Sequence, residues 1–319
     1  MDPIKRRTFL KAGLTSSVIG FPSLGQALGA NDRVQVALIG CGGRGTQVTS
    51  SLAARSDVVC TQICDIHEER LVRTADFIAK QQGGRKPLLA THMEEIFANK
   101  DVDAVVVATP DHWHTPAAIL ACQAGKDVYV EKPFSHNIWE GRKLVEAARK
   151  YKRVVQVGTQ NRSAPYNLAA RDYIQSGKLG DIRLVKVFNL KGGGPFHLGA
   201  PGQAPSSFPW KTWLGPANAR PYHSKIFHGG WHYFWDYSGG DLADCGIHQL
   251  DLAIMLLGDP ATPKSVSASG GRLQHKGDDG EVPDVEILHY DYPEFVMTFE
   301  HSHFANAMSK INGKIRSGN

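Results

Sequence analysis

The sequence predicts an α/β fold, with an N-terminal doubly wound parallel sheet and a C-terminal α+β domain that contains an open, largely antiparallel sheet. The first part of this prediction rests on residues 33–157, where short apolar runs alternate with helix-compatible stretches. That alternation is typical of parallel strands whose two faces are covered by helices. The second part rests on the segment 182–190, which alternates between apolar and polar side chains as a strand with one buried face does.

The length and composition indicate a folded chain of two domains. Of its 319 residues, 42% are hydrophobic and 21% are charged, which supports buried cores and leaves little room for extended disorder. A chain of this size exceeds one typical hydrophobic core. We therefore expect a leader over residues 1–30, a parallel-sheet domain over residues 31–160 and an α+β domain over residues 161–319.

The charge distribution argues against a nucleic-acid partner. The formal net charge is +5 at pH 7, but residues 1–30 and residues 305–319 each contribute +3. The body between them is therefore close to neutral, and it lacks the basic face that phosphate binding requires.

The first 30 residues have the pattern of a twin-arginine export signal. Residues 5–11 read KRRTFLK and precede a moderately apolar run that ends in small residues near Ala30. A basic amphipathic helix is the alternative, but glycines and a proline between residues 13 and 25 would break it. We therefore expect the twin-arginine machinery to export the chain, to the periplasm or elsewhere outside the cytoplasm.

A glycine turn follows the first predicted strand. Residues 33–39 have a buried-strand pattern, residues 40–45 match G-x-G-x-x-G, and a helix-compatible stretch covers residues 46–55. Strand, turn and helix in this order are the fingerprint of a Rossmann dinucleotide site. The turn residues expected at the cofactor are Gly40, Gly42, Gly43, Arg44 and Gly45.

Three glycines and one acid carry the cofactor prediction. Gly40 allows the tight turn, Gly42 lets the backbone approach the pyrophosphate, and Gly45 lets the helix pack closely on the sheet. Asp65 follows the second strand, where its carboxylate would accept from ribose hydroxyls and repel the 2′-phosphate of NADP, so NAD is favoured. Arg70 keeps NADP open as the less favoured cofactor. Capping of the following helix is the alternative role for Asp65.

Polar residues follow three further predicted strands, over residues 102–108, 126–130 and 154–157. Ligands of open parallel sheets bind beyond the carboxyl ends of the strands. The residues at those ends are therefore site candidates: the segment from Thr109 to His114, the pair Glu131 and Lys132, and Gln160. On position alone, Lys132 fits a surface lysine at a strand end equally well.

In the second domain, the segment from Gly239 to Asp251 is predicted to open a helix. Asp244 and His248 are four residues apart and so share one helical face. An imidazole is suited to accept a hydroxyl proton near neutral pH, and a neighbouring carboxylate can orient it. The solvated face of an amphipathic helix is the alternative. Later strands are predicted over residues 265–269, 285–290 and 295–300.

The cysteines and histidines predict neither disulfides nor a metal. The five cysteines are an odd number, and most lie in predicted strands or helices, so we interpret them as buried thiols. They are Cys41, Cys60, Cys64, Cys122 and Cys245. Five histidines of the second domain are too irregularly spaced to indicate a metal site, although several could line a pocket. They are His223, His228, His232, His301 and His303.

Taken together, these residues make the chain resemble the family of glucose-fructose oxidoreductase, inositol dehydrogenase and their sugar-oxidising relatives (Gfo/Idh/MocA). The likeness extends over nearly everything after residue 31. It is carried by the GCGGRG turn, the ATPDHWH segment, the EKP tripeptide at Glu131, Lys132 and Pro133, and the D-x-x-x-H pair at Asp244 and His248. It departs at Asp111, where many relatives have Asn.

The resemblance implies an NAD-dependent oxidoreductase that acts on a CH–OH group of a carbohydrate. Lys132, Asp244 and His248 would be the catalytic residues, and Lys132 or His248 would remove the hydroxyl proton while hydride passes to the nicotinamide. The residues expected at the cofactor beside the glycine turn are Thr109, Pro110, His114, Glu131 and Lys132. His112 and Trp113 would pack or line the pocket.

Three functions fit these residues. The first is an exported dehydrogenase of a sugar, polyol or glycoside. The second is a glycosidase whose retained NAD oxidises a hydroxyl, permits elimination of the aglycone and is then regenerated. The third is a sugar-binding protein without turnover. Exported relatives are expected to continue beyond Asn319 through further strands of the second sheet, and a shortened second domain could bind sugar without catalysing a reaction. An open sheet also favours a homo-oligomer.

Overall fold

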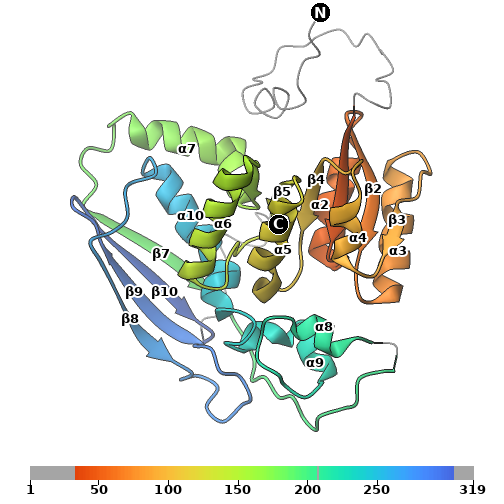
Figure 1. Cartoon of the computed structure of the whole chain (residues 1–319). Coiled ribbons are helices and arrows are strands. Elements are labelled where there is room, and N and C mark those ends of the chain that lie inside the picture. Colours follow the sequence, from red (N-terminus) through yellow and green to blue (C-terminus); the bar gives the residue numbers. More distant parts are fainter. Residues whose placement is uncertain (1–32, 207, 305–319) are drawn as a thin grey trace, which may run out of the picture. The chain divides into compact units, whose positions relative to one another are not determined.

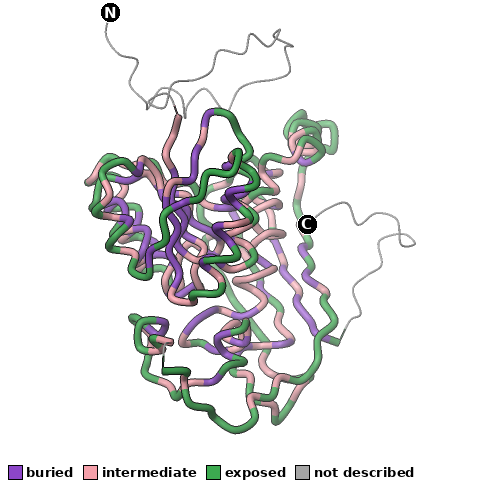
Figure 2. Tube along the Cα trace, turned by 90° about the vertical axis from the view of Figure 1, so that its right-hand side faces the viewer, coloured by how far each residue is buried: buried purple, intermediate pink, exposed green. Residues whose placement is uncertain are grey.

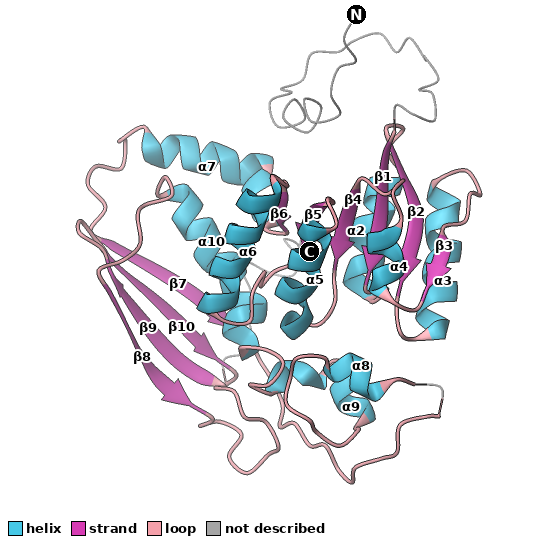
Figure 3. Cartoon of the chain, viewed as in Figure 1, coloured by secondary structure: helices cyan, strands magenta, loops and turns pink. Residues whose placement is uncertain are grey.

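The computed structural model describes residues 33–206 and 208–304. The predicted leader over residues 1–30 lies outside the described residues, as does the segment 305–319. The described chain contains a six-stranded sheet followed by a four-stranded sheet (Figure 1, Figure 3). Within these residues, no helix is long and apolar enough to cross a membrane.

The first sheet is parallel throughout, with the strand order β3-β2-β1-β4-β5-β6. This is the order of a Rossmann dinucleotide-binding domain, so the predicted fold class is confirmed. Its strands are β1 (Val34–Ile39), β2 (Val58–Cys64), β3 (Leu88–Ala90), β4 (Ala104–Val107), β5 (Asp127–Val130) and β6 (Val155–Val157).

Helices cover both faces of this sheet because side chains alternate along each strand. Val36 and Leu38 of β1 point to one face, and Ala37 and Ile39 point to the other. The first face carries α2 (Gly43–Ala53) and α3 (Glu68–Gln81); the second carries α4 (Met93–Ala98), α5 (Asp111–Gln123) and α6 (Ile138–Tyr151). Figure 2 shows the buried residues gathered in the strands between these two helical layers.

The strands β1 and β4 are neighbours in the sheet. After β1 the chain continues to β2 on one side, and after β4 it continues to β5 on the opposite side. A switch point of this kind opens a crevice beyond the carboxyl ends of the strands. At this crevice, α5 begins at Asp111, so the segment Asp111 to His114 forms its first turn. Pro110 and Pro116 could each mark a helix start, and the helix begins after the first of them.

The second sheet has the order β7-β10-β9-β8, in which β7 and β10 are parallel and the other pairings are antiparallel. This confirms an open, largely antiparallel sheet. One face is covered by α10 (Ile247–Leu256), whose Leu250 and Ala253 pack with Val187 and Phe299 of the sheet. The other helix beside α10 is α7 (Pro165–Gln175), and the strands are β7 (Leu184–Leu190), β8 (Ser265–Gly271), β9 (Val285–Asp291) and β10 (Val296–Ser302).

The long connection between β7 and α10 carries an aromatic cluster that packs against the first domain. It contains two short helices, α8 (Trp210–Leu214) and α9 (Ser224–Phe227), which lie near the carboxyl ends of β1 and β4 (Figure 1). Trp113 of α5 donates a hydrogen bond from its Nε1 to the carbonyl oxygen of Trp213, at 2.9 Å. The ring of His67 stacks on Phe227, with 5.4 Å between ring centroids. The connection therefore closes one side of the crevice.

Candidate active site

A cavity of about 550 Å³ occupies the crevice at the switch point. Its walls come from the ends of β1, β2, β4 and β5 and, on the other side, from α8, α9 and the segment before α10. Nearly all of the predicted cofactor residues line it: Gly40, Gly42, Gly43, Arg44, Asp65, Thr109, Pro110, His114, Glu131 and Lys132. Gly45 is buried behind this wall. Of the strand-end candidates, Thr109, Glu131 and Lys132 thus reach one cavity, whereas Gln160 is absent from its wall.

Two glycines of the glycine turn, Gly40 and Gly45, lie against backbone atoms, and a third, Gly42, borders open space. Gly40 has a φ of +97°, and a Cβ on it would lie 2.5 Å from the carbonyl oxygen of Ala108. A Cβ on Gly45 would overlap the carbonyl oxygen of Gly40. A Cβ on Gly42 would meet nothing within 4 Å, and no side chain caps the first turn of α2 that begins after it. The free N–H groups and the positive end of the helix dipole fit a pyrophosphate there.

Asp65 lines the cavity and also holds the glycine turn. Its Oδ2 accepts a hydrogen bond from the Cys41 N–H at 2.7 Å, and its Oδ1 accepts from the His67 N–H at 2.8 Å. The N-cap of α3 is His67, so Asp65 is not the capping residue. Burial raises the pKa of Asp65, and these two hydrogen bonds oppose that effect. Each carboxylate oxygen still has a lone pair that a ribose hydroxyl can use.

An ion pair joins the glycine turn to the end of β5. Arg44 Nε lies 2.8 Å from Glu131 Oε1, which also accepts from the Tyr129 hydroxyl at 3.0 Å. The same guanidinium donates to Gln160 Oε1 at 3.2 Å. Arg44 therefore ties the glycine turn to two residues that follow other strands, Glu131 and Gln160, a link that the sequence did not reveal.

Polar atoms without partners point to a polar ligand at the ends of β4 and β5. Thr109 Oγ1, His114 Nε2 and Glu131 Oε2 are buried and have no hydrogen-bond partner among the described residues. His114 Nδ1 lies 2.7 Å from the carbonyl oxygen of Pro133, so Nδ1 carries the hydrogen and Nε2 keeps a lone pair. Burial lowers the pKa of His114, which keeps its ring neutral. Such unsatisfied atoms suit the carboxamide of a nicotinamide.

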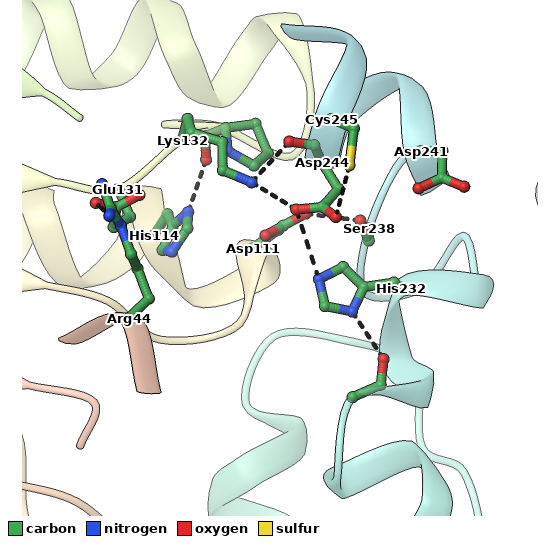
Figure 4. A network of polar contacts seen from close by, with 12 residues as sticks. Arg44, Asp111, His114, Glu131, Lys132, His232, Ser238, Asp241, Asp244 and Cys245 are labelled. Carbon is green, nitrogen blue, oxygen red and sulfur yellow. Dashed lines mark hydrogen bonds and ion pairs between the residues drawn. The ribbon is translucent and has the colours of Figure 1, made fainter. Parts of the chain in front are cut away.

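Lys132 and Asp244 meet across the cavity although they are far apart in the sequence (Figure 4). Lys132 Nζ lies 2.5 Å from Asp244 Oδ1 and 2.7 Å from the carbonyl oxygen of the same residue. Burial opposes ionisation of Asp244, but the neighbouring Lys132 and His232 bring its pKa below the usual value. This pair joins the end of β5 to the segment before α10.

His232 is the third polar side chain at this end of the cavity (Figure 4). Its Nε2 lies 3.9 Å from Asp244 Oδ1, and its Nδ1 lies 2.7 Å from the carbonyl oxygen of Gly229. Nδ1 therefore carries the hydrogen and Nε2 is free to accept a proton. Burial lowers the pKa of His232, so the ring is neutral near pH 7. The sequence had suggested His232 only as one of several histidines that could line a pocket.

His248 does not form the expected contact with Asp244. It shares no hydrogen bond with Asp244 or Lys132 within the described chain, and it is absent from the cavity wall. Asp244 lies in a π-helical turn over Leu242–Gly246, whereas His248 lies in the first turn of α10, so the regular α-helical spacing assumed for the pair is absent. Burial and the nearby Lys132 lower the pKa of His248, which therefore stays neutral near the pair.

Asp111 is a buried acid on the cavity wall at the position where many relatives have Asn. It is 4% exposed, and Ser238 Oγ donates to its Oδ2 at 2.6 Å. Burial raises the pKa of Asp111 to about 8. The side chain is therefore protonated at neutral pH, and a neutral carboxylic acid has nearly the shape and polarity of the asparagine amide.

Two models of one oxidoreductase family match the chain. The model "Oxidoreductase family, NAD-binding Rossmann fold" matches residues 34–159, and "Oxidoreductase family, C-terminal alpha/beta domain" matches residues 190–316. The chain is 29% identical over 197 residues to a glycosyl hydrolase family 109 protein of Solibacter usitatus, covering 57% of this chain and 45% of that protein. It is 29% identical over 198 residues to 1,5-anhydro-D-fructose reductase of Ensifer adhaerens, covering 62% and 50%. The matches thus span half or less of these curated relatives.

Solved structures share the fold at low identity. The dehydrogenase WlbA of Bordetella pertussis, in complex with NADH and UDP-GlcNAcA, superposes with a TM-score of 0.66 at 21% identity, covering 85% of this chain and 70% of that one. GenD2 from gentamicin A biosynthesis, in complex with NAD, superposes with a TM-score of 0.65 at 24% identity, covering 89% and 69%. Both likenesses support the same two-domain architecture.

Proposed function

This chain belongs to the Gfo/Idh/MocA family of oxidoreductases, and on that premise we propose that it exchanges a hydride between NAD and a CH–OH carbon of a sugar, polyol or glycoside. The observation that carries the proposal is the Lys132–Asp244 pair, which stands at the junction between the dinucleotide cavity and the second domain. A substrate hydroxyl at this junction would meet both a cofactor and ionisable side chains.

The residues divide into cofactor-binding and reacting groups. The glycine turn, Asp65 and the strand-end residues Thr109, His114 and Glu131 would hold the dinucleotide. Bound NAD supplies the acceptor for hydride. Lys132, held by Asp244, would donate a hydrogen bond to the substrate oxygen as negative charge develops on it.

A neutral histidine beside this pair would accept the hydroxyl proton as the carbon loses its hydride. The resemblance implies His248 or Lys132 for this role, and His248 is the histidine of the two. The geometry adds His232, because its Nε2 keeps a lone pair on the cavity wall at 3.9 Å from Asp244 Oδ1. Kinetic comparison of a His232 variant with a His248 variant decides between the two histidines.

The proposal is tested by incubating the purified protein with NAD and a panel of sugars, polyols and glycosides. Formation of NADH supports a net dehydrogenase. Native mass measurement of the same preparation establishes whether NAD or NADP is retained through purification. If the protein bound neither dinucleotide, the proposed function would be overturned.

A glycosidase with a retained cofactor is the second candidate. It is favoured by relatives named as glycosyl hydrolase family 109 proteins and by the presence of two separate proton-handling groups, the Lys132–Asp244 pair and His232, in one cavity. After oxidation of one hydroxyl, elimination of the aglycone needs a base for the adjacent carbon-bound proton. Release of free sugar without net NADH would identify this reaction, whereas a protein that binds sugar without turnover would show neither product.

We propose that the chain is exported and that it forms a homo-oligomer. The twin-arginine leader is a sequence pattern alone, and a fusion of residues 1–30 to a reporter would test it. A homo-oligomer is suggested by apolar side chains on the uncovered face of the second sheet, including Leu184, Phe188 and Ile287. Sedimentation of the purified chain measures the oligomeric state directly.

A further inference from the structure

A second cluster of ionisable side chains lies outside the cavity wall, between the end of β10 and the segment before α10. His301 lies near the end of β10 and His303 directly follows that strand, and their ring centroids are 5.2 Å apart. Both are buried, with exposures of 2% and 5%. Asp241 Oδ2 lies 2.5 Å from Nε2 of His303 and 3.7 Å from Nε2 of His301. Three potential ligands thus converge from two separate elements.

His301 presents a lone pair to this cluster. Its Nδ1 lies 2.9 Å from the carbonyl oxygen of Asn189, an atom that can only accept, so Nδ1 carries the hydrogen. The Asn189 side-chain amide lies farther away, at 3.2 Å. Nε2 of His301 is buried and has no hydrogen-bond partner among the described residues. Two acceptors, this nitrogen and the Asp241 oxygen, therefore face each other, an arrangement that a cation between them would stabilise.

We propose that Asp241, His301 and His303 bind a divalent transition-metal ion of the zinc class. Their ligand atoms all lie within 4.8 Å of one another. Metal–ligand distances of about 2.0–2.1 Å at tetrahedral angles place donor atoms about 3.3 Å apart, so small side-chain adjustments complete the site. Two imidazoles and one carboxylate form a donor set that suits zinc. The Asn189 carbonyl is also the kind of partner that ligating histidines use on their second nitrogen.

The surroundings of the cluster are compatible with added positive charge. Lys191 Nζ lies 2.6 Å from Asp241 Oδ1, but this side chain is 45% exposed and can turn to solvent. Glu286 stands directly opposite His301 in the antiparallel register, so a second carboxylate lies beside the cluster.

Asp284 is a further carboxylate near His303. It is fully buried and accepts hydrogen bonds from the backbone N–H groups of Leu273 and His275, at 2.7 and 2.8 Å. Ligand atoms of Asp284, His275 and His303 also lie within 4.8 Å of one another. Nδ1 of His303 is buried and has no hydrogen-bond partner among the described residues.

The proposed ion has a structural role. It would fasten the end of β10 to Asp241, which lies three residues before Asp244 in the segment that carries the catalytic candidate. The site is separate from the dinucleotide cavity and does not depend on the proposed function. The irregular spacing of the second-domain histidines had predicted no metal, and Asp241 is distant from His301 and His303 in the sequence.

The test uses the full chain without a histidine tag. The protein is stripped with a chelator, dialysed, and titrated calorimetrically with zinc chloride, and a parallel sample receives cobalt(II) for its visible absorption spectrum. We expect one equivalent of zinc to bind, with visible bands from cobalt in a low-coordinate site. The midpoint of thermal unfolding should rise on zinc addition, because an ion that binds only the folded chain stabilises it.

Variants assign the site to these residues. His301→Ala and His303→Ala should each weaken zinc binding at least 100-fold. The matched control is His289→Ala, which removes an exposed histidine from the neighbouring strand β9 and should leave binding unchanged. Circular dichroism and NAD binding report whether each variant is folded. The proposal is overturned if the unaltered chain binds no stoichiometric zinc or cobalt, or if a folded His301→Ala/His303→Ala double variant binds as tightly as the unaltered chain.

Discussion

Lys132 Nζ lies 2.5 Å from Asp244 Oδ1, and this contact joins residues that are separated by 112 positions in the sequence. One comes from the carboxyl end of a parallel strand and the other from the segment before a helix of the second domain. The pair therefore exists only when the two domains are assembled, and it places opposite charges where a substrate can lie against the dinucleotide cavity.

Replacement of Lys132 by Met should abolish hydride exchange while sparing NAD binding. The substitution keeps the length of the side chain and removes the charge that the developing oxyanion needs, so turnover should fall by roughly 100-fold or more. Steady-state kinetics and calorimetric titration with NAD measure the two effects. Lys186→Met, on the exposed face of β7, is the matched control and should behave as the unaltered chain. Unchanged turnover in Lys132→Met would remove this residue from the mechanism.

Single replacement of His232 and His248 by Asn distinguishes the two proposed proton acceptors. The geometry predicts the larger loss of kcat for His232→Asn, by roughly 100-fold, because its free Nε2 faces the cavity. The effect of an acid–base group should also alter the pH profile of kcat, which a merely structural role would not do. If instead His248→Asn loses its activity and His232→Asn keeps both its kcat and its pH profile, the proton acceptor is His248 and not His232.

Gly45→Ala should destabilise the fold and abolish NAD binding. The added Cβ would overlap the carbonyl oxygen of Gly40, and backbone atoms cannot move aside cheaply. Overpacking of this kind costs about 1–3 kcal/mol or more. Urea unfolding measures the loss of stability, for which Gly43→Ala is the control, since its Cβ would meet nothing within 4 Å. Equal stability of the two variants would show that the turn is looser than the structure indicates.

Asp111→Asn should change how stability depends on pH. The pKa of Asp111 is raised from the ordinary 3.8 to about 8 by burial, so between these values the folded chain holds a proton that the unfolded chain has released. Its free energy of unfolding therefore falls as pH rises through this window, by up to about 1.4 kcal/mol per pH unit, and levels off above it. The amide does not titrate, so the variant should gain stability relative to the unaltered chain as pH rises.

Urea unfolding curves across that pH window test this prediction. The control is Glu69→Gln, which neutralises an exposed acid on α3. A stability difference between Asp111→Asn and the unaltered chain that does not vary with pH would mean that Asp111 is ionised in the folded protein. Activity should survive the substitution near neutral pH, because the buried acid is neutral there.

The sequence predicted the parts of the site that depend on local order along the chain. Strand, turn and strand-end positions follow from apolar runs and their boundaries, and Gly40, Asp65, Glu131 and Lys132 were found in this way. Helical spacing singled out Asp244 together with His248, and the resemblance implied their catalytic role. The strand-end positions could be predicted because the carboxyl ends of parallel strands meet at one edge of the sheet.

Contacts between distant segments could not be predicted. The bonds from Arg44 to Glu131 and from Ser238 to Asp111 join residues that lie 87 and 127 positions apart. No local sequence pattern predicts these two contacts. The π-helical turn over Leu242–Gly246 is a related case, because regular helical spacing was the basis for pairing Asp244 with His248. The wide turn changes the path of the chain while leaving the sequence spacing the same.

The most direct test of hydride exchange at the Lys132–Asp244 pair is rapid mixing of the NAD-loaded protein with a panel of sugars, polyols and glycosides while reduced nicotinamide is followed by absorbance. Both the dehydrogenase and the glycosidase pass through this species, so the measurement addresses the step that they share. We predict that reduced nicotinamide forms in the unaltered chain and does not form in Lys132→Met. Formation at the same rate in both, or a chain that takes up no NAD, would contradict the account.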